Sequence, residues 1–171
     1  MNKLYIITGP AGVGKSTISK EIAKRSNKSA LIEGDEIYHL VSGGYISPWK
    51  EGNHLKVFWE NCIDIITNFL NNGYDVVFNY IINKEKIEEL KQVFNNIEVE
   101  IKFVVLMVDE QTIIKRDAMR PEDCQMKERS LILLENTKKQ NFNKNNILDT
   151  SKLSIEETVK NILEGNRFKI N

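Results

Sequence analysis

Nine consecutive residues near the start of the chain have the composition needed to bind phosphate groups. They are Gly9-Pro10-Ala11-Gly12-Val13-Gly14-Lys15-Ser16-Thr17 and fit the pattern G-x-x-x-x-G-K-[ST]. Glycines let main-chain amides converge on a β-phosphate, and a helix that begins there directs its positive end at the same anion. The alternative is a simple glycine turn with an exposed lysine, but such a turn would not require glycine, lysine and serine at these fixed spacings. The pattern predicts that Lys15 reaches the β- and γ-phosphates and that the Ser16 hydroxyl binds Mg²⁺, which takes few protein ligands.

Two carboxylates come directly after the second predicted strand. Glu33 and Asp35 are separated by one residue, so on an extended chain their side chains share one face. Ligands of open α/β sheets gather at such strand ends, and the pair therefore predicts a ligand-binding site. The alternative is that Asp35 only caps the next helix. His39, one helical turn later, is a candidate substrate contact, although a histidine held by structural hydrogen bonds fits equally well.

Three of the five arginines lie within fourteen positions, at Arg116, Arg120 and Arg129. A guanidinium group offers a planar fork for phosphate oxygens that lysine does not reproduce. Arg116 and Arg120 are one turn apart on a helix predicted to start near Asp109 and to stop at Pro121, so they can point together.

The alternative for these arginines is a solvated surface. Arg116 would then pair with Asp117 on an exposed helix face. Arg129 would belong to a surface network with nearby acidic residues, which are Glu122, Asp123 and Glu128.

Short apolar runs alternate with helical patterns along the chain. The runs predict strands at Leu4 to Thr8, Ala30 to Glu33, Val76 to Ile81, Ile101 to Val108 and, more weakly, Ile147 to Asp149. The clearest helix follows Asn53 and ends before Gly73, and a capping box at Ser154 and Glu157 begins another. Because apolar strands of this kind are buried on both faces, we expect a single α/β domain over residues 1–171. It has three layers and a five-stranded parallel sheet.

The chain resembles the P-loop kinase superfamily, and within it the small-molecule kinases that include shikimate kinase, gluconate kinase and antibiotic phosphotransferases. The resemblance rests on the element order, the phosphate loop, the arginine pair and the segment Ile32-Glu33-Gly34-Asp35-Glu36-Ile37-Tyr38-His39. It implies an α/β/α P-loop kinase fold with an acceptor-binding region at 36–60 and a small helical lid at 116–130. By the same resemblance, Asp35 holds the acceptor hydroxyl and takes its proton, while Glu33 orients Mg²⁺-bound water. Arg116 would flank the nucleotide, and Arg120 would neutralise the transferred charge.

One position departs from the pattern of these kinases. Asn79 stands where many relatives carry a carboxylate at the end of the third strand, and an amide adds no negative charge to a magnesium site. Glu33 and Asp35 could organise the metal through water instead, or the activity could be weakened. Thr150 follows the fifth strand, where such kinases surround the adenine with backbone groups. The guanine-reading pattern Asn-Lys-x-Asp is absent, because Asn83-Lys84-Glu85-Lys86 lacks the final aspartate, and this favours ATP as the donor.

Aromatic residues near the predicted site are candidate substrate contacts. Tyr45 and Trp49 lie in the loop from Gly43 to Lys50 and could stack on a sugar or a base, and Tyr80 lies in the third predicted strand. The alternative for Trp49 is a buried hydrophobic anchor.

Composition excludes several classes of partner. The 24 basic and 24 acidic residues cancel and the pI is about 6.8, so no overall field attracts nucleic acid or an anionic membrane. No apolar run approaches the roughly 20 residues of a membrane span. Cys62 and Cys124 lie far apart without metal-ligand spacing. We expect a reduced cytoplasmic protein, a monomer or weak homodimer, with a small-molecule partner and no nucleic acid.

These observations predict an ATP- and Mg²⁺-dependent phosphotransferase that acts on a hydroxyl of a sugar acid, cyclitol, antibiotic or related metabolite. A nucleoside or nucleoside-monophosphate kinase is one alternative, although the middle of the chain offers lysines without an arginine pair for an acceptor phosphate. An ATP-binding regulatory protein with little catalysis is another, motivated by Asn79. The acceptor, the oligomeric state and the extent of lid closure do not follow from the sequence.

Overall fold

The computed structural model describes residues 1–170, and the side chain of Cys124 lies outside the described part. Five strands form one parallel sheet in the order β2-β3-β1-β4-β5. They are β1 (Asn2–Thr8), β2 (Ser29–Glu33), β3 (Asp75–Asn79), β4 (Val99–Met107) and β5 (Ile147–Asp149). The predicted five-stranded parallel sheet is confirmed.

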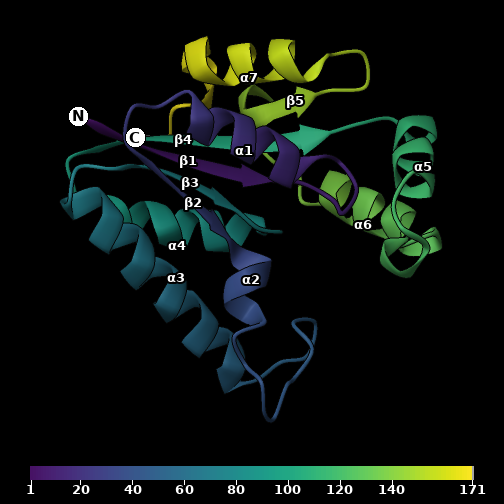
Figure 1. Ribbon diagram of the computed structural model, residues 1–171, viewed down its shortest axis with the longest axis horizontal. Coiled ribbons are helices and arrows are strands. Elements are labelled where there is room, and N and C mark those ends of the chain that lie inside the picture. The colour runs from purple at the N-terminus through teal and green to yellow at the C-terminus, as the bar shows by residue number, and fades with distance from the viewer. Residues whose placement is uncertain (171) are drawn as a thin grey trace.

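Helices cover both faces of the sheet (Figure 1). In chain order they are α1 (Lys15–Lys24), α2 (Gly34–Tyr38), α3 (Asn53–Asn71), α4 (Lys84–Phe94), α5 (Glu110–Ala118), α6 (Glu128–Lys139) and α7 (Ile155–Glu164). Short 3₁₀ turns lie at Glu122–Cys124, Lys144–Asn146 and Asn166–Phe168. Figure 1 shows α3 and α4 below the sheet, α1 and α7 above it, and α5 with α6 beyond the strand ends. The expected three-layer α/β/α architecture is confirmed.

Alternate residues of the central strand supply the two halves of the core. Leu4 and Ile6 pack with α3 and α4, whereas Tyr5 and Ile7 pack with α1, α5 and α7. All four are buried, which explains why β1 reads as a continuous apolar run instead of an alternating one. Each such aliphatic side chain contributes about 1.5–3 kcal/mol by leaving water. The two cores hold the carboxyl ends of the strands in place, where the candidate site lies.

Helix α3 has two apolar faces with different surroundings. Phe58, Cys62, Ile66 and Leu70 recur every fourth residue and are buried against the sheet. An adjacent stripe of Leu55, Trp59 and Ile63 is only partly buried. The predicted helix is confirmed, and its second stripe packs against the margin of the core.

The third strand ends earlier than the sequence predicts. Its expected end at Ile81 is wrong, because β3 stops at Asn79. The amide of Ile82 donates a hydrogen bond to Thr8 Oγ1 at 2.9 Å, so the chain crosses the end of β1 before α4 begins at Lys84. The apolar run therefore includes residues that leave the sheet, and Ile81 is 45% exposed.

The other predicted boundaries differ by one or two residues. Strands β1 and β4 begin at Asn2 and Val99, two residues earlier than expected, because polar positions also join the ladder. The capping box predicted for the last helix is present, with Ser154 and Glu157 bonded reciprocally. It satisfies amides at the start of α7 that would otherwise lack partners.

No helix within residues 1–170 combines the length and the apolar character that a bilayer span requires. Cys62 is a buried free thiol, and desolvation raises its pKa to about 12. It therefore packs as a small apolar side chain. The expectation for Cys124 lies outside the described side chains.

Candidate functional site

The phosphate loop occupies the turn between β1 and α1, and its backbone requires glycine. Gly12 and Gly14 have φ angles of 83° and 104°, in the left-handed region that favours glycine. A Cβ on Gly9 would lie 2.3 Å from the main-chain oxygen of Leu106. Helix α1 starts at Lys15 directly after Gly14, so its first amides face the turn. Together, the loop and the helix form a cradle that fits a phosphate group.

Lys15 bends back over the phosphate loop. Its ammonium donates to the main-chain oxygens of Gly9 at 2.9 Å and Pro10 at 3.1 Å. Desolvation lowers the pKa of Lys15 to about 8, the charge of Asp35 opposes this shift, and the charge of Arg120 adds to it. Asp35 and Arg120, the other two residues predicted to be catalytic, therefore both lie within electrostatic reach of Lys15, although their roles stay predictions.

A hydroxyl and a carboxylate meet beside the loop. Ser16 Oγ donates to Glu33 Oε2 at 3.0 Å, and Lys20 Nζ lies 3.4 Å from Glu33 Oε1. Within residues 1–170 no cluster of three His, Cys, Asp or Glu side chains could hold a metal. The hydroxyl and carboxylate nevertheless fit Mg²⁺, which takes most of its ligands from phosphate oxygens and water. Val13 is buried in the loop and Thr17 is exposed at the start of α1.

Asn79 lies beside this pair. It is buried at the end of β3, opposite Ile7 on one side and Glu33 on the other. In the described part of the chain, its Nδ2 has no hydrogen-bond partner. The carboxylate next to Ser16 therefore comes from β2, one strand away from the position that Asn79 occupies.

Asp35 is exposed in the first turn of α2. The N-cap of this helix is Glu33, so the alternative that Asp35 serves as the cap is wrong. Gly34 is required beside it, because a Cβ would lie 2.7 Å from the ring of Tyr80. Burial, and to a smaller extent the charge of Asp35, raise the pKa of Tyr80. The Tyr80 hydroxyl therefore stays protonated near the carboxylate.

Arg116 joins the phosphate loop to the segment after β5. Its Nη1 donates to the oxygen of Val13 at 2.8 Å, and its Nη2 donates to the oxygen of Thr150 at 3.2 Å. The alternative pairing of Arg116 with Asp117 is wrong, because Asp117 pairs with Arg120 at 3.4 Å. The predicted nucleotide-binding residues Arg116 and Thr150 thus lie together on one side of the loop.

Asp117 is a residue that the sequence analysis treated only as surface. It is buried and accepts hydrogen bonds from the amides of Met126 at 3.0 Å and Lys127 at 2.7 Å. These hydrogen bonds, the one from Met126 foremost, lower its pKa. Asp117 therefore holds the turn between α5 and α6 and orients Arg120. The sequence signal for the contact between Asp117 and Arg120 was their spacing of three residues on one helix, which makes the two side chains neighbours.

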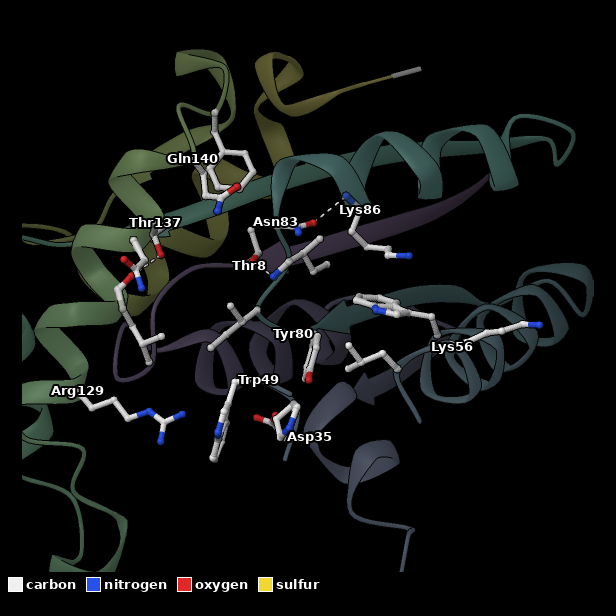
Figure 2. Close-up of a pocket in the computed structure, with 18 of the residues that line it drawn as sticks. Thr8, Asp35, Trp49, Lys56, Tyr80, Asn83, Lys86, Arg129, Thr137 and Gln140 are labelled. Carbon is white, nitrogen blue, oxygen red and sulfur yellow. Dashed lines mark hydrogen bonds between the residues drawn. The ribbon is translucent and has the colours of Figure 1, made fainter. Parts of the chain in front are cut away.

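A cavity of about 770 Å³ lies next to the phosphate loop, between α3, α6 and the turn after β3. Figure 2 shows Asp35, Trp49 and Tyr80 at one end of it and Thr137 and Gln140 at the other. The full lining is Thr8, Asp35, Pro48, Trp49, Leu55, Lys56, Trp59, Glu60, Ile63, Tyr80, Ile81, Ile82, Asn83, Lys86, Met126, Arg129, Leu133, Asn136, Thr137, Gln140 and Phe142.

The structure separates the candidate substrate contacts into two groups. Asp35, Trp49 and Tyr80 line the cavity. His39 and Tyr45 do not, and their rings stack on each other with centroids 5.9 Å apart. These two residues therefore form part of the aromatic cluster around α2.

Trp49 and Arg129 contact each other at the cavity. Trp49 is 65% exposed, so the alternative of a buried anchor is wrong. The Arg129 guanidinium carbon lies 4.3 Å from the centre of the Trp49 ring, a cation–π contact that replaces the expected network with acidic neighbours. The sequence analysis also missed two lining residues. The helical spacing of Trp59 indicated only a core position, and no pattern singled out Leu133.

Comparisons with known proteins agree with this geometry. A family model described as an AAA domain matches residues 6–149, and no curated protein matches the chain. Three similar solved structures are an unliganded sugar kinase from Janibacter sp. HTCC2649, a tunicamycin resistance protein from Deinococcus radiodurans and a gluconokinase from Sinorhizobium meliloti 1021.

The similarity to these structures extends over nearly the whole chain. Their TM-scores are 0.68, 0.68 and 0.67, at 14%, 15% and 17% identity. Each alignment covers 95% of this chain, and 93%, 94% and 90% of the respective structures. At this identity the likeness shows the fold, which is that of P-loop kinases. Because the family model spans the phosphate loop, both carboxylates after β2 and the sheet through β5, the chain belongs to the AAA domain family of P-loop proteins.

Proposed function

We propose that this protein transfers the γ-phosphate of ATP to a hydroxyl of a small molecule in a Mg²⁺-dependent reaction. The observation that carries the proposal is the position of Asp35. Its carboxylate interacts electrostatically with Lys15 of the phosphate loop, and it also lines the adjoining cavity. An acid between a phosphate cradle and an open cavity is placed to serve an acceptor hydroxyl.

The chain's own residues would act as follows. Asp35 accepts the proton of the acceptor hydroxyl while the acceptor oxygen forms a bond to the γ-phosphorus. The bond from that phosphorus to the bridging oxygen breaks, and ADP leaves with the electron pair. Lys15 and Arg120 offset the negative charge on the transferred group. Ser16, with Glu33 beside it, would hold Mg²⁺, which would supply further charge neutralisation.

Arg116 gives the nucleotide a boundary. Its contacts with the oxygens of Val13 and Thr150 close one side of the phosphate loop. An adenine bound there would lie against this guanidinium and the backbone around Thr150, which supports ATP as the donor.

The test separates nucleotide binding from transfer. Isothermal titration with Mg²⁺ATP should give heat with the wild-type protein and much less with Lys15→Ala. Asp35→Asn should keep nucleotide affinity and lower acceptor-dependent ADP formation by about a hundredfold or more, the usual size of a lost general base. Asp64→Asn is the matched control, because Asp64 is an exposed carboxylate on α3 that does not line the cavity.

Two results would contradict the proposal. Absence of heat with Mg²⁺ATP would exclude the nucleotide site. Unchanged transfer in Asp35→Asn would exclude the proposed base. Tight binding of ATP by the wild-type protein with no transfer to any alcohol would favour the regulatory alternative.

A further inference from the structure

The cavity beside Asp35 is walled mainly by apolar side chains. Leu55, Trp59 and Ile63 form the partly buried stripe of α3, one residue per turn. Ile81 and Ile82 add a second wall from the turn after β3, and α6 with the segment after it adds Leu133 and Phe142. Ile81 is 45% exposed although it is isoleucine. These surfaces would gain from contact with an apolar ligand.

Three polar side chains at the far end of the cavity each have one polar atom that is already bonded within the protein. Asn83 Oδ1 accepts from the amide of Lys86 at 2.8 Å. Gln140 Oε1 accepts from the amide of Lys84 at 3.2 Å, and Thr137 Oγ1 donates to the oxygen of Leu133 at 2.8 Å. A ligand with many hydroxyls would therefore find fewer free hydrogen-bonding atoms at this end of the cavity than in water. Each unmatched hydroxyl weakens binding by roughly tenfold.

The basic side chains of the cavity are also engaged. Lys56 Nζ lies 3.7 Å from Glu60 on the same helix. Lys86 pairs with Glu89, and its ammonium lies 5.1 Å from the centre of the Trp59 ring. The Arg129 guanidinium lies against Trp49. The cavity thus lacks the pair of converging cations that would favour a phosphate or carboxylate on the ligand.

We propose that the phosphate acceptor is an uncharged alcohol with a largely apolar body, and not a sugar acid, a cyclitol or a nucleotide. This inference rests on the proposed function. The apolar body would lie between the α3 stripe and Leu133, and the hydroxyl would point to Asp35 at the end next to the phosphate loop. A volume of about 770 Å³ accommodates a ligand of two or more rings. Trp49 is exposed at the same end and offers a ring face for stacking.

Both tryptophans of the chain, Trp49 and Trp59, line this cavity, so tryptophan fluorescence reports directly on its occupancy. The probe is 4-phenylcyclohexanol, titrated with excitation selective for tryptophan and compared with gluconate, shikimate and AMP. We expect the apolar alcohol to shift the emission at concentrations at least tenfold lower than any of the polar compounds. The measurement needs neither nucleotide nor turnover.

A pair of matched variants controls for folding. Ile81→Asp places a charge in the cavity at a position that is already 45% exposed, and Ile132→Asp does the same at a 57% exposed position of α6 outside the cavity. Binding of 4-phenylcyclohexanol should weaken at least tenfold in Ile81→Asp and stay unchanged in Ile132→Asp. Thermal unfolding of both variants checks that the fold is intact.

The outcomes distinguish this inference from the proposed function. Tighter binding of gluconate, shikimate or AMP than of the apolar alcohol would overturn the inference alone. The absence of any fluorescence change with the apolar alcohol, or equal binding by both isoleucine variants, would also overturn it. If the alcohol binds but neither it nor any other alcohol is phosphorylated with Mg²⁺ATP, the proposed function fails while the ligand class is supported.

Discussion

Replacing Lys15 with methionine should remove a pH dependence of stability that the wild-type protein shows in the alkaline range. The structure holds the Lys15 ammonium over the main-chain oxygens of Gly9 and Pro10. Desolvation foremost lowers its pKa from the ordinary value of 10.5 to about 8. The folded protein therefore releases this proton at a lower pH than the unfolded chain does.

The sign and size of the effect follow from this difference. Below pH 8 both states hold the proton, and burial of the charge destabilises the folded state fully. Between pH 8 and 10.5 only the unfolded chain stays protonated, so the free energy of unfolding rises with pH. The difference of 10.5 minus 8 corresponds to about 3 kcal/mol at about 1.4 kcal/mol for each pH unit. Above pH 10.5 the contribution is constant.

Urea denaturation at intervals of pH from 7 to 11 measures the effect, although other groups titrate in the same range. The informative quantity is the wild-type free energy of unfolding minus that of Lys15→Met, since groups common to both proteins cancel. Lys160→Met, at an exposed position of α7, is the control and should give a difference that does not vary with pH. A pH-independent difference for Lys15→Met would refute the reasoning.

Protonation of Lys15 should also affect the affinity for nucleotide. Bound phosphates would stabilise the protonated form of Lys15, so the affinity for Mg²⁺ATP should be highest below pH 8, where Lys15 is already protonated. Above that pH it should fall by up to tenfold for each unit until the pKa of the complex is reached. Calorimetric affinities at pH 7 and pH 9 compare the two conditions directly.

Three further changes test the surroundings of the site. Asp117→Asn should lower the free energy of unfolding by about 2 kcal/mol, and limited proteolysis should cut the turn at Met126 faster, because this carboxylate accepts from main-chain amides. Gly34→Ala should cost about 1–3 kcal/mol in thermal unfolding by contact with Tyr80, and adding Tyr80→Ala, which removes the ring atoms nearest to the new Cβ, should restore part of it. Ser154→Ala should cost about 1 kcal/mol by circular dichroism and leave Mg²⁺ATP affinity unchanged.

Elements that depend on neighbours in the chain were predictable. The phosphate loop was found because backbone geometry demands glycine at Gly12 and Gly14. The long helix α3 was found from its apolar spacing, and the start of α7 from the capping box at Ser154. The end of β3 was predicted too late, because an apolar run does not record that the amide of Ile82 bonds to Thr8 across the sheet.

The partners of polar side chains were not predictable. Arg116 contacts carbonyls at Val13 and Thr150, which lie 103 and 34 positions away in the chain. Asp117 looks like a surface residue of a helix in the sequence. In the structure it is buried, and it accepts hydrogen bonds from amides in the turn after α5. The type of a charged residue shows which groups it can bind, but the sequence does not show which distant atoms the fold brings next to it.

The sequence by itself determined the fold class and the phosphate loop, since each follows from local geometry or from periodic burial. It predicted Glu33 and Asp35 on one extended segment, and this was wrong, because β2 ends at Glu33 and Asp35 lies in the first turn of α2. Only the tertiary structure decided what surrounds Asp35. Packing brought Trp49 and Tyr80 to the cavity and left His39 stacked on Tyr45 outside it. A cavity is bounded by elements far apart in the chain, so its polarity depends on which faces remain after the core has been filled.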